Sequence, residues 1–160
     1  MADQREPQGT HSHQEGSIEE RRARRRAAHA SQTYAAFIKR LCDRGGMSPA
    51  VAQQAAVSVL CAVEQRINSD ETRDLEAQLP NKLADLLHRC ERHEDELPGK
   101  FGREDLLRRV GEDLALNPDA VEPVVRAVLN SIRDLISEGE AEDVMSQLPE
   151  DLRELWRHPV

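Results

Sequence analysis

The tripeptide Gln-Leu-Pro occurs twice in this chain, at residues 78–80 and 147–149, and leucines follow each proline after three and six positions. When the chain is shifted against itself by 69 residues, residues 36–87 align with residues 105–156 without a gap, and both prolines stay in register. A gapless match of this length indicates an internal duplication. The fold must therefore suit the same pattern of residues twice.

Both copies carry the pattern of helices. Alanine, leucine, glutamate and arginine are abundant and aromatic residues make up only 2% of the chain, which favours an all-α fold. A first helix is expected at about residues 32–44 and again at about residues 102–114. A second helix begins at Ser48-Pro49 and at Asn117-Pro118, because Ser or Asn can accept first-turn N–H groups and proline suits the first helical position.

The third helix of each copy opens with the spacing of a capping box, Asn68-x-x-Glu71 and Ser137-x-x-Glu140. In a capping box the cap side chain accepts a backbone N–H, and the glutamate reaches back to the backbone N–H of the cap residue. The proline of Gln-Leu-Pro then ends this helix and suits the first turn of a fourth one. The repeated tripeptide is thus interpreted as a corner between two helices.

The domain organisation follows from the repeat. We expect an internally duplicated helical bundle with about four helices in each repeat, at residues 31–94 and 101–158, preceded by a disordered tail at residues 1–30. A half of some 55 residues buries little core by itself, so the two repeats are expected to pack as one domain with approximate two-fold pseudosymmetry.

The stretch "SEGEAEDVMSQLPEDLRELW", its echo "SDETRDLEAQLPNKLADLL" and the upstream "PDAVEPVVRAVLNSI" resemble a bacterial domain-of-unknown-function family, DUF2267. The resemblance covers about Ser31 to His158 and implies an all-helical, internally duplicated cytoplasmic protein. It implies no activity, cofactor or catalytic residue. One departure is Gly45-Gly46, where the second copy has Leu114-Ala115, which predicts a looser first corner.

The composition of the chain limits its expected cellular location and the kinds of partner that it can bind. No apolar run approaches the roughly 20 residues of a membrane span, and the N-terminus lacks the apolar segment of a secretory signal, so a cytoplasmic location is expected. The three cysteines are an odd number, which speaks against a disulfide framework. Residues 33–160 hold 16 basic and 25 acidic groups, so nucleic acid or an anionic surface would have to bind through the tail.

Gln78 and Gln147 are the uncharged polar pair of the two corners. They are candidates for recognising a partner, but the simpler expectation is that each amide satisfies carbonyl groups left open where its helix ends.

Four carboxylates also repeat, and they are Glu71, Asp74, Glu140 and Asp143. Capping and the helix dipole explain each of them, and the two sets come from different halves of the chain. We therefore expect no acid–base or metal site there. No Glu-x-x-His motif of the kind found in carboxylate metal bundles occurs in the chain.

The segment "LHRCERHEDE" brings together His88, Cys90 and His93, which are weak candidates for a zinc or copper site. The equivalent positions of the second copy lack them, and a second pair of ligands is missing, so a solvated linker is the favoured interpretation. No metal or other cofactor is expected.

An arginine run is the most unusual local feature, and its members are Arg21, Arg22, Arg24, Arg25 and Arg26. Such a run can neutralise phosphates or dock on an anionic surface. The favoured interpretation is a solvated segment, or one that lies against the acidic body of its own chain or of a second copy. A helix capped by Ser17-x-x-Glu20 would carry these arginines into Tyr34. Interleaved aromatic residues that would stack on bases are missing.

The chain carries no Gly-rich phosphate loop, no nucleophile elbow and no His-Glu-x-x-His. We therefore expect a non-enzymatic interaction or regulatory module that binds a protein partner through helical surfaces. The alternatives are a nucleic-acid or anionic-surface binder that uses the arginine run, and a metal or thiol sensor. The chain is also compatible with a homo-oligomer.

Overall fold

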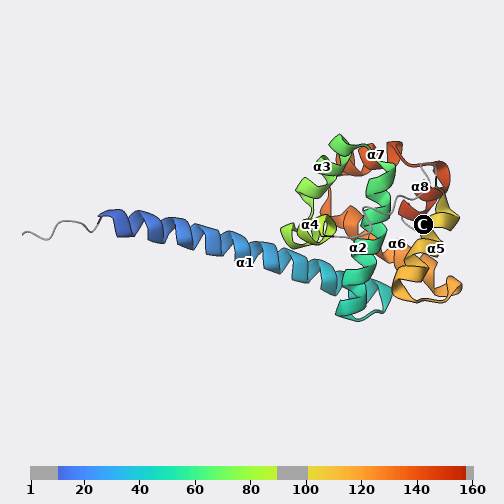
Figure 1. Ribbon diagram of the computed structural model, residues 1–160, viewed down its shortest axis with the longest axis horizontal. Helices are drawn as coiled ribbons and strands as arrows, with labels where there is room; N and C mark the ends of the chain where they lie inside the picture. The colour runs from blue at the N-terminus through green and yellow to red at the C-terminus, as the bar shows by residue number, and fades with distance from the viewer. Residues whose placement is uncertain (1–10, 90–100, 158–160) are drawn as a thin grey trace, which may run out of the picture.

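A computed structural model describes residues 11–89 and 101–157, and all of the secondary structure in these residues is helical. The described helices are α1 (His11–Gly45), α2 (Pro49–Arg66), α3 (Ser69–Gln78), α4 (Asn81–His88), α5 (Arg103–Leu114), α6 (Pro118–Leu135), α7 (Glu138–Ser146) and α8 (Glu150–Trp156), as Figure 1 shows. The predicted all-α, duplicated architecture is confirmed, with α1–α4 and α5–α8 as the two copies.

The predicted helix boundaries are also found. Pro49 opens α2, and the side chain of Ser48 accepts the backbone N–H of Val51 at 3.3 Å. Pro118 opens α6 in the same way, although the side chain of Asn117 makes no capping bond. Proline at the first position loses no helical hydrogen bond, so both starts suit the sequence.

Each Gln-Leu-Pro forms the predicted corner. The carbonyl of Pro80 accepts the N–H groups of the first turn of α4, and the carbonyl of Pro149 does the same for α8. Leu83 of α4 and Leu152 of α8 then turn into the core, where both are buried. The proline thus ends one helix and starts the next, as its missing N–H and fixed φ require.

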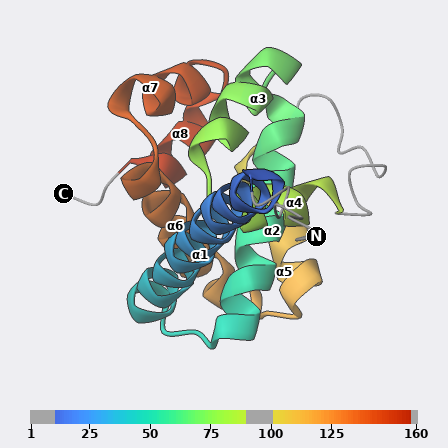
Figure 2. The ribbon, with the colours of Figure 1, turned by 90° about the vertical axis from the view of Figure 1, so that its left-hand side faces the viewer.

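The two repeats share one core. α1 packs on α6 just as α5 packs on α2, and two pairs of equivalent helices, α2 with α6 and α3 with α7, pack on each other. Figure 2 shows α1 lying across the bundle between α2 and α6. This pattern is the expected two-fold pseudosymmetry, and its axis passes between α2 and α6 and between α3 and α7. The largest fully buried side chains come from both copies and include Phe37, Leu41, Leu60, Leu75, Leu83, Leu87, Phe101, Leu106, Leu129, Ile132, Leu155 and Trp156.

The corner between the first two helices contains one residue with positive φ in both copies. Gly46 has φ +63°, and the equivalent Ala115 has φ 52°. Both residues therefore occupy the left-handed region, which glycine enters without strain and alanine does not.

α1 is longer than expected, because it runs through most of the predicted tail. Tyr34, Phe37 and Leu41 anchor its C-terminal part in the core, while its N-terminal part extends away from the bundle (Figure 1). Of the expected tail, residues 1–10 lie outside the described part of the chain, and residues 11–30 are helical. A helix running through the arginines into Tyr34 is confirmed, although it begins before Ser17.

Within the described residues, no single helix is long and apolar enough to cross a membrane. The segments Thr33–Gly45 and Pro49–Arg66 would reach that length and composition only together, and they meet at a bend of 96°.

Candidate functional site

The site with the most unusual chemistry lies where α3 of the first repeat meets α7 of the second. Both helices begin with the predicted side-chain caps. The backbone N–H of Glu71 donates to Asn68 Oδ1 at 2.8 Å, and the backbone N–H of Glu140 donates to Ser137 Oγ at 3.1 Å. This half of the predicted capping box is therefore present in both copies.

The other half of the capping box is replaced by a contact between the repeats. The backbone N–H of Asn68 donates to Gln147 Oε1 at 2.7 Å, and the backbone N–H of Ser137 donates to Gln78 Oε1 at 2.7 Å. The expectation that the glutamates would reach back to these N–H groups is wrong. The glutamines use their oxygens as acceptors for the other repeat, so the expectation that they satisfy open carbonyls is also corrected.

The two glutamines act as a reciprocal clasp, because each one comes from the corner of one repeat and caps a helix of the other. We call Gln78 and Gln147, together with the two cap residues that they bind, the glutamine clasp. Whether Gln78 and Gln147 also contact a partner stays a prediction.

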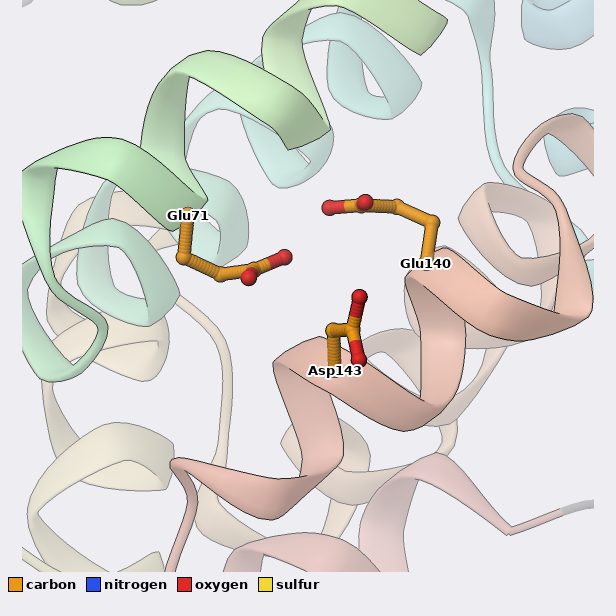
Figure 3. A group of neighbouring side chains, drawn as sticks. All are labelled: Glu71, Glu140 and Asp143. Atoms are coloured by element: carbon orange, nitrogen blue, oxygen red, sulfur yellow. The ribbon is translucent and has the colours of Figure 1, made fainter.

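Because the clasp occupies the backbone N–H groups of the cap residues, the side chains of Glu71 and Glu140 turn toward each other. Glu71 points from α3 toward Glu140 of α7, and Asp143, one turn further along α7, points into the same space (Figure 3). Carboxylate oxygens of the three residues all lie within 4.8 Å of one another. The expectation that the two sets of carboxylates stay apart is wrong, because the pseudo-two-fold axis brings equivalent residues together. We call these three residues the acidic junction.

Burial and like charge determine the protonation of the acidic junction. The side chains of Glu71 and Glu140 are buried, whereas Asp143 is exposed. Burial first, and then a hydrogen bond with Glu71 and repulsion by Glu71, Asp74 and Asp143, together raise the pKa of Glu140 to about 7. Near neutral pH the junction therefore exchanges a proton. Its oxygens are also hard ligands, of the kind that bind divalent cations.

Of the three predicted metal or thiol candidates, the described residues include His88 alone. His88 is exposed, and its Nε2 lies 3.0 Å from Glu76 Oε2. Cys90 and His93 lie outside the described residues. Of the described cysteines, Cys61 is buried in the core and Cys42 is half-buried. A sensor built on His88, Cys90 and His93 stays a prediction.

The arginine run lies on the part of α1 that extends from the bundle. Arg21, Arg22, Arg24 and Arg25 are exposed, and Arg26 belongs to the same helix, with its side chain outside the described part. Residues 17–25 show no buried side chain. We call residues 17–25 of α1 the basic arm.

Two shallow grooves occupy equivalent places on the two repeats. One, of about 480 Å³, lies between α1 and α2, and the other, of about 490 Å³, lies between α5 and α6. Their equivalent lining residues are Ala35 and Glu104, Ile38 and Leu107, Lys39 and Arg108, Cys42 and Gly111, and Pro49 and Pro118. The duplication preserves their position, but the polar groups on their rims differ.

The acidic junction was the site that sequence reasoning missed, although the sequence held a signal for it. In a two-fold arrangement, a residue near the axis meets its own equivalent. Glu71 and Glu140 are equivalent positions of the two copies and are identical. Only the direction of the axis, which depends on how the repeats pack, decides that this pair meets.

Comparison with known proteins supports the reading of the motifs. No curated protein matches this chain. A family model described as "Uncharacterized conserved protein (DUF2267)" matches residues 34–155, which span both repeats and leave out the basic arm. The all-helical body with its two Gln-Leu-Pro corners thus belongs to the DUF2267 family.

Proposed function

We propose that this protein is a non-enzymatic, cytoplasmic interaction module that binds an acidic surface of a protein partner through the basic arm. The observation that carries the proposal is the continuity of α1. The helix that presents the arginines is the same helix that buries Tyr34, Phe37 and Leu41 in the core. The arm is therefore fixed to the body without a hinge in its secondary structure.

Charge supports a partner with an acidic surface. Residues 17–25 hold four arginines and two glutamates, whereas residues 33–160 carry a net charge of −9 (16 basic minus 25 acidic groups). An acidic body repels anions, so a binding surface for anions must stand clear of it. The arm meets this requirement, because α1 extends from the bundle (Figure 1) and because its described arginines are exposed.

Nucleic acid is the second candidate, because an exposed row of arginines also suits a phosphate backbone. Residues 17–25 contain no aromatic residue to stack on bases, so such binding would be purely electrostatic and would weaken steeply with salt. This lack of specific contacts makes a protein partner the better candidate.

A cross-linked pull-down from nuclease-treated lysate tests the proposal. The full-length protein is compared with a variant in which Arg21, Arg22, Arg24 and Arg25 are all changed to alanine, which keeps the helix propensity of the arm. A matched control changes the same four residues to lysine and keeps the charge. We expect the wild type and the lysine control to capture the same protein and the alanine variant to lose it.

The outcomes separate the two candidates. The same pull-down is also made from untreated lysate, and capture that occurs there but is lost in the nuclease-treated lysate assigns the arm to nucleic acid. Equal capture by the alanine variant would contradict any role of the arm, and the paired helical faces of the two repeats would then be the surface to examine.

A further inference from the structure

Apart from the hydrogen bond between its two glutamates, the acidic junction contains buried acceptor atoms that no donor of the described residues reaches. The side chains of Glu71 and Glu140 are 8% and 7% exposed, so both are more than nine-tenths buried. Among the described residues, neither Glu71 Oε1 nor Glu140 Oε1 has a hydrogen-bond partner. Buried carboxylate oxygens are normally paired with a donor or a cation, because an unpaired buried charge is costly.

The glutamine clasp explains why no backbone donor is available. The N–H groups of Asn68 and Ser137 are the natural partners of these glutamates, but they donate to Gln147 and Gln78. The N–H groups of Glu71 and Glu140 are likewise taken by the cap side chains. The polar groups at the two helix starts thus satisfy one another, and the carboxylates face a space between the repeats without a positive group of their own.

The spacing of the oxygens indicates which cation fits this space. Two oxygens that bind the same ion lie at most twice the metal–oxygen distance apart. That limit is about 4.6–5.2 Å for calcium and about 4.0–4.2 Å for magnesium. One carboxylate oxygen from each of Glu71, Glu140 and Asp143 lies within 4.8 Å of the other two, and this upper bound falls in the range of separations that calcium can bridge. A set of ligands made of oxygen alone also disfavours zinc and copper.

We propose that Glu71, Glu140 and Asp143 bind one calcium ion between the two repeats. Glu71 would supply one ligand from α3, and Glu140 and Asp143 would supply two from α7 (Figure 3). Asp74 holds the position on α3 equivalent to Asp143, and water would complete the shell. The ion would tie α3 of the first repeat to α7 of the second, independently of the basic arm.

Calorimetric titration of the chelator-treated, full-length protein tests the proposal, with calcium chloride and magnesium chloride as the two probes. We expect one calcium ion per chain and a melting temperature that rises with calcium concentration. Magnesium should bind at least about tenfold more weakly, because it needs shorter distances and keeps its water.

Three single variants locate the ion. Glu71→Gln, Glu140→Gln and Asp143→Asn each remove one charged ligand while keeping the shape of the side chain, and each should weaken calcium binding by at least about tenfold. Glu142→Gln is the matched control, because Glu142 is an exposed residue of α7 outside the acidic junction, and it should bind calcium like the wild type. A thermal unfolding curve of each variant in chelator verifies that it is folded.

Two results would overturn the proposal. The first is the absence of both binding heat and a shift in melting temperature at calcium concentrations up to about 10 mM, well above the dissociation constants of about 10⁻⁴–10⁻³ M that weak protein sites show. The second is calcium binding that Glu140→Gln and Asp143→Asn leave unchanged. Asp143 is exposed, so its variant should fold even where a buried substitution does not.

Discussion

The contacts between the two repeats fall into two groups, those on the pseudo-two-fold axis and those away from it. The groups differ in how similar the equivalent contacts of the two copies have remained. At the α3/α7 junction the contacts are reciprocal, because Glu71 faces its equivalent Glu140 and the two clasp bonds have the same length of 2.7 Å. Away from the axis the copies have diverged. Arg44 of α1 donates to Ser131 and Asp134 of α6, whereas the equivalent Asp113 of α5 accepts a hydrogen bond from Ser58 of α2.

A second pair of contacts shows the same divergence. The Tyr34 hydroxyl donates to Gln53 Oε1 at 2.7 Å, and at the equivalent positions Arg103 pairs with Glu122. A contact far from the axis occurs independently in each copy, so each copy can change it together with its own partner. A contact on the axis is isologous, which means that equivalent residues of the two copies meet there. A substitution in one copy is therefore placed against the unchanged residue of the other copy. The axis is therefore where the duplication constrains the residues most.

The largest effect is expected from cavities in the fourth helix of either repeat. Trp156→Ala should lower the free energy of unfolding by about 3–5 kcal/mol, and the equivalent Leu87→Ala by about 2–5 kcal/mol, because both side chains are fully buried. Since the repeats share one core, each variant should unfold in a single transition. Urea denaturation followed by circular dichroism measures both quantities, and separate transitions for the two halves would contradict a shared core.

The next effect concerns the pH dependence of the junction in chelator. The pKa of Glu140 is about 7 in the folded protein and 4.5 when unperturbed. The protonated Glu140 carboxyl makes its full contribution to the free energy of unfolding below pH 4.5. This contribution is lost as the pH rises through 7, because Glu140 ionises at a lower pH in the unfolded chain than in the folded protein. We expect a loss on the order of 2 kcal/mol between pH 5 and pH 8.

Glu140→Gln should remove this part of the pH dependence, and Glu142→Gln should keep it. Unfolding curves at a series of pH values test this expectation. A wild-type profile that matches that of Glu140→Gln would show that the two glutamates do not face each other.

Removal of the glutamine clasp should have a smaller effect. Gln78→Ala and Gln147→Ala should each lower the free energy of unfolding by about 1 kcal/mol, because water can reach the exposed cap residues that lose their acceptors. The two losses should not be additive, since both bonds hold one junction. Gln54→Ala, at an exposed position of α2, is the control and should be neutral.

The smallest effects are expected at the two corners that each contain a residue in the left-handed region. Ala115→Gly should raise the free energy of unfolding by less than about 1 kcal/mol, and Gly46→Ala should lower it by about 1 kcal/mol. An added Cβ at Gly46 meets no atom within 4 Å, so the cost there comes from the backbone alone. Equal effects of the same sign in both corners would contradict their shared conformation.

The local parts of the fold were predictable from the sequence, and the contacts across the axis were not. Ser48-Pro49 and Pro80 act within a few residues of themselves, so their roles as helix start and corner follow from local chemistry. Glu71 was assigned to a capping box because its spacing fits one, but the N–H that it would bind is taken by Gln147 from the other repeat. A tertiary contact overrode a sound local rule, because local spacing does not indicate which side of each repeat faces the axis.

A carboxyl-carbon NMR titration of the full-length protein in chelator tests the central claim most directly. If the clasp frees Glu71 and Glu140 to face each other, the signal of Glu140 should titrate with a midpoint near pH 7, far from that of the exposed Glu142. If Glu140 and Glu142 titrate together near the ordinary value for glutamate, about 4.3, the glutamates are not paired across the repeats. In that case the account of the acidic junction, including its calcium ion, would be contradicted.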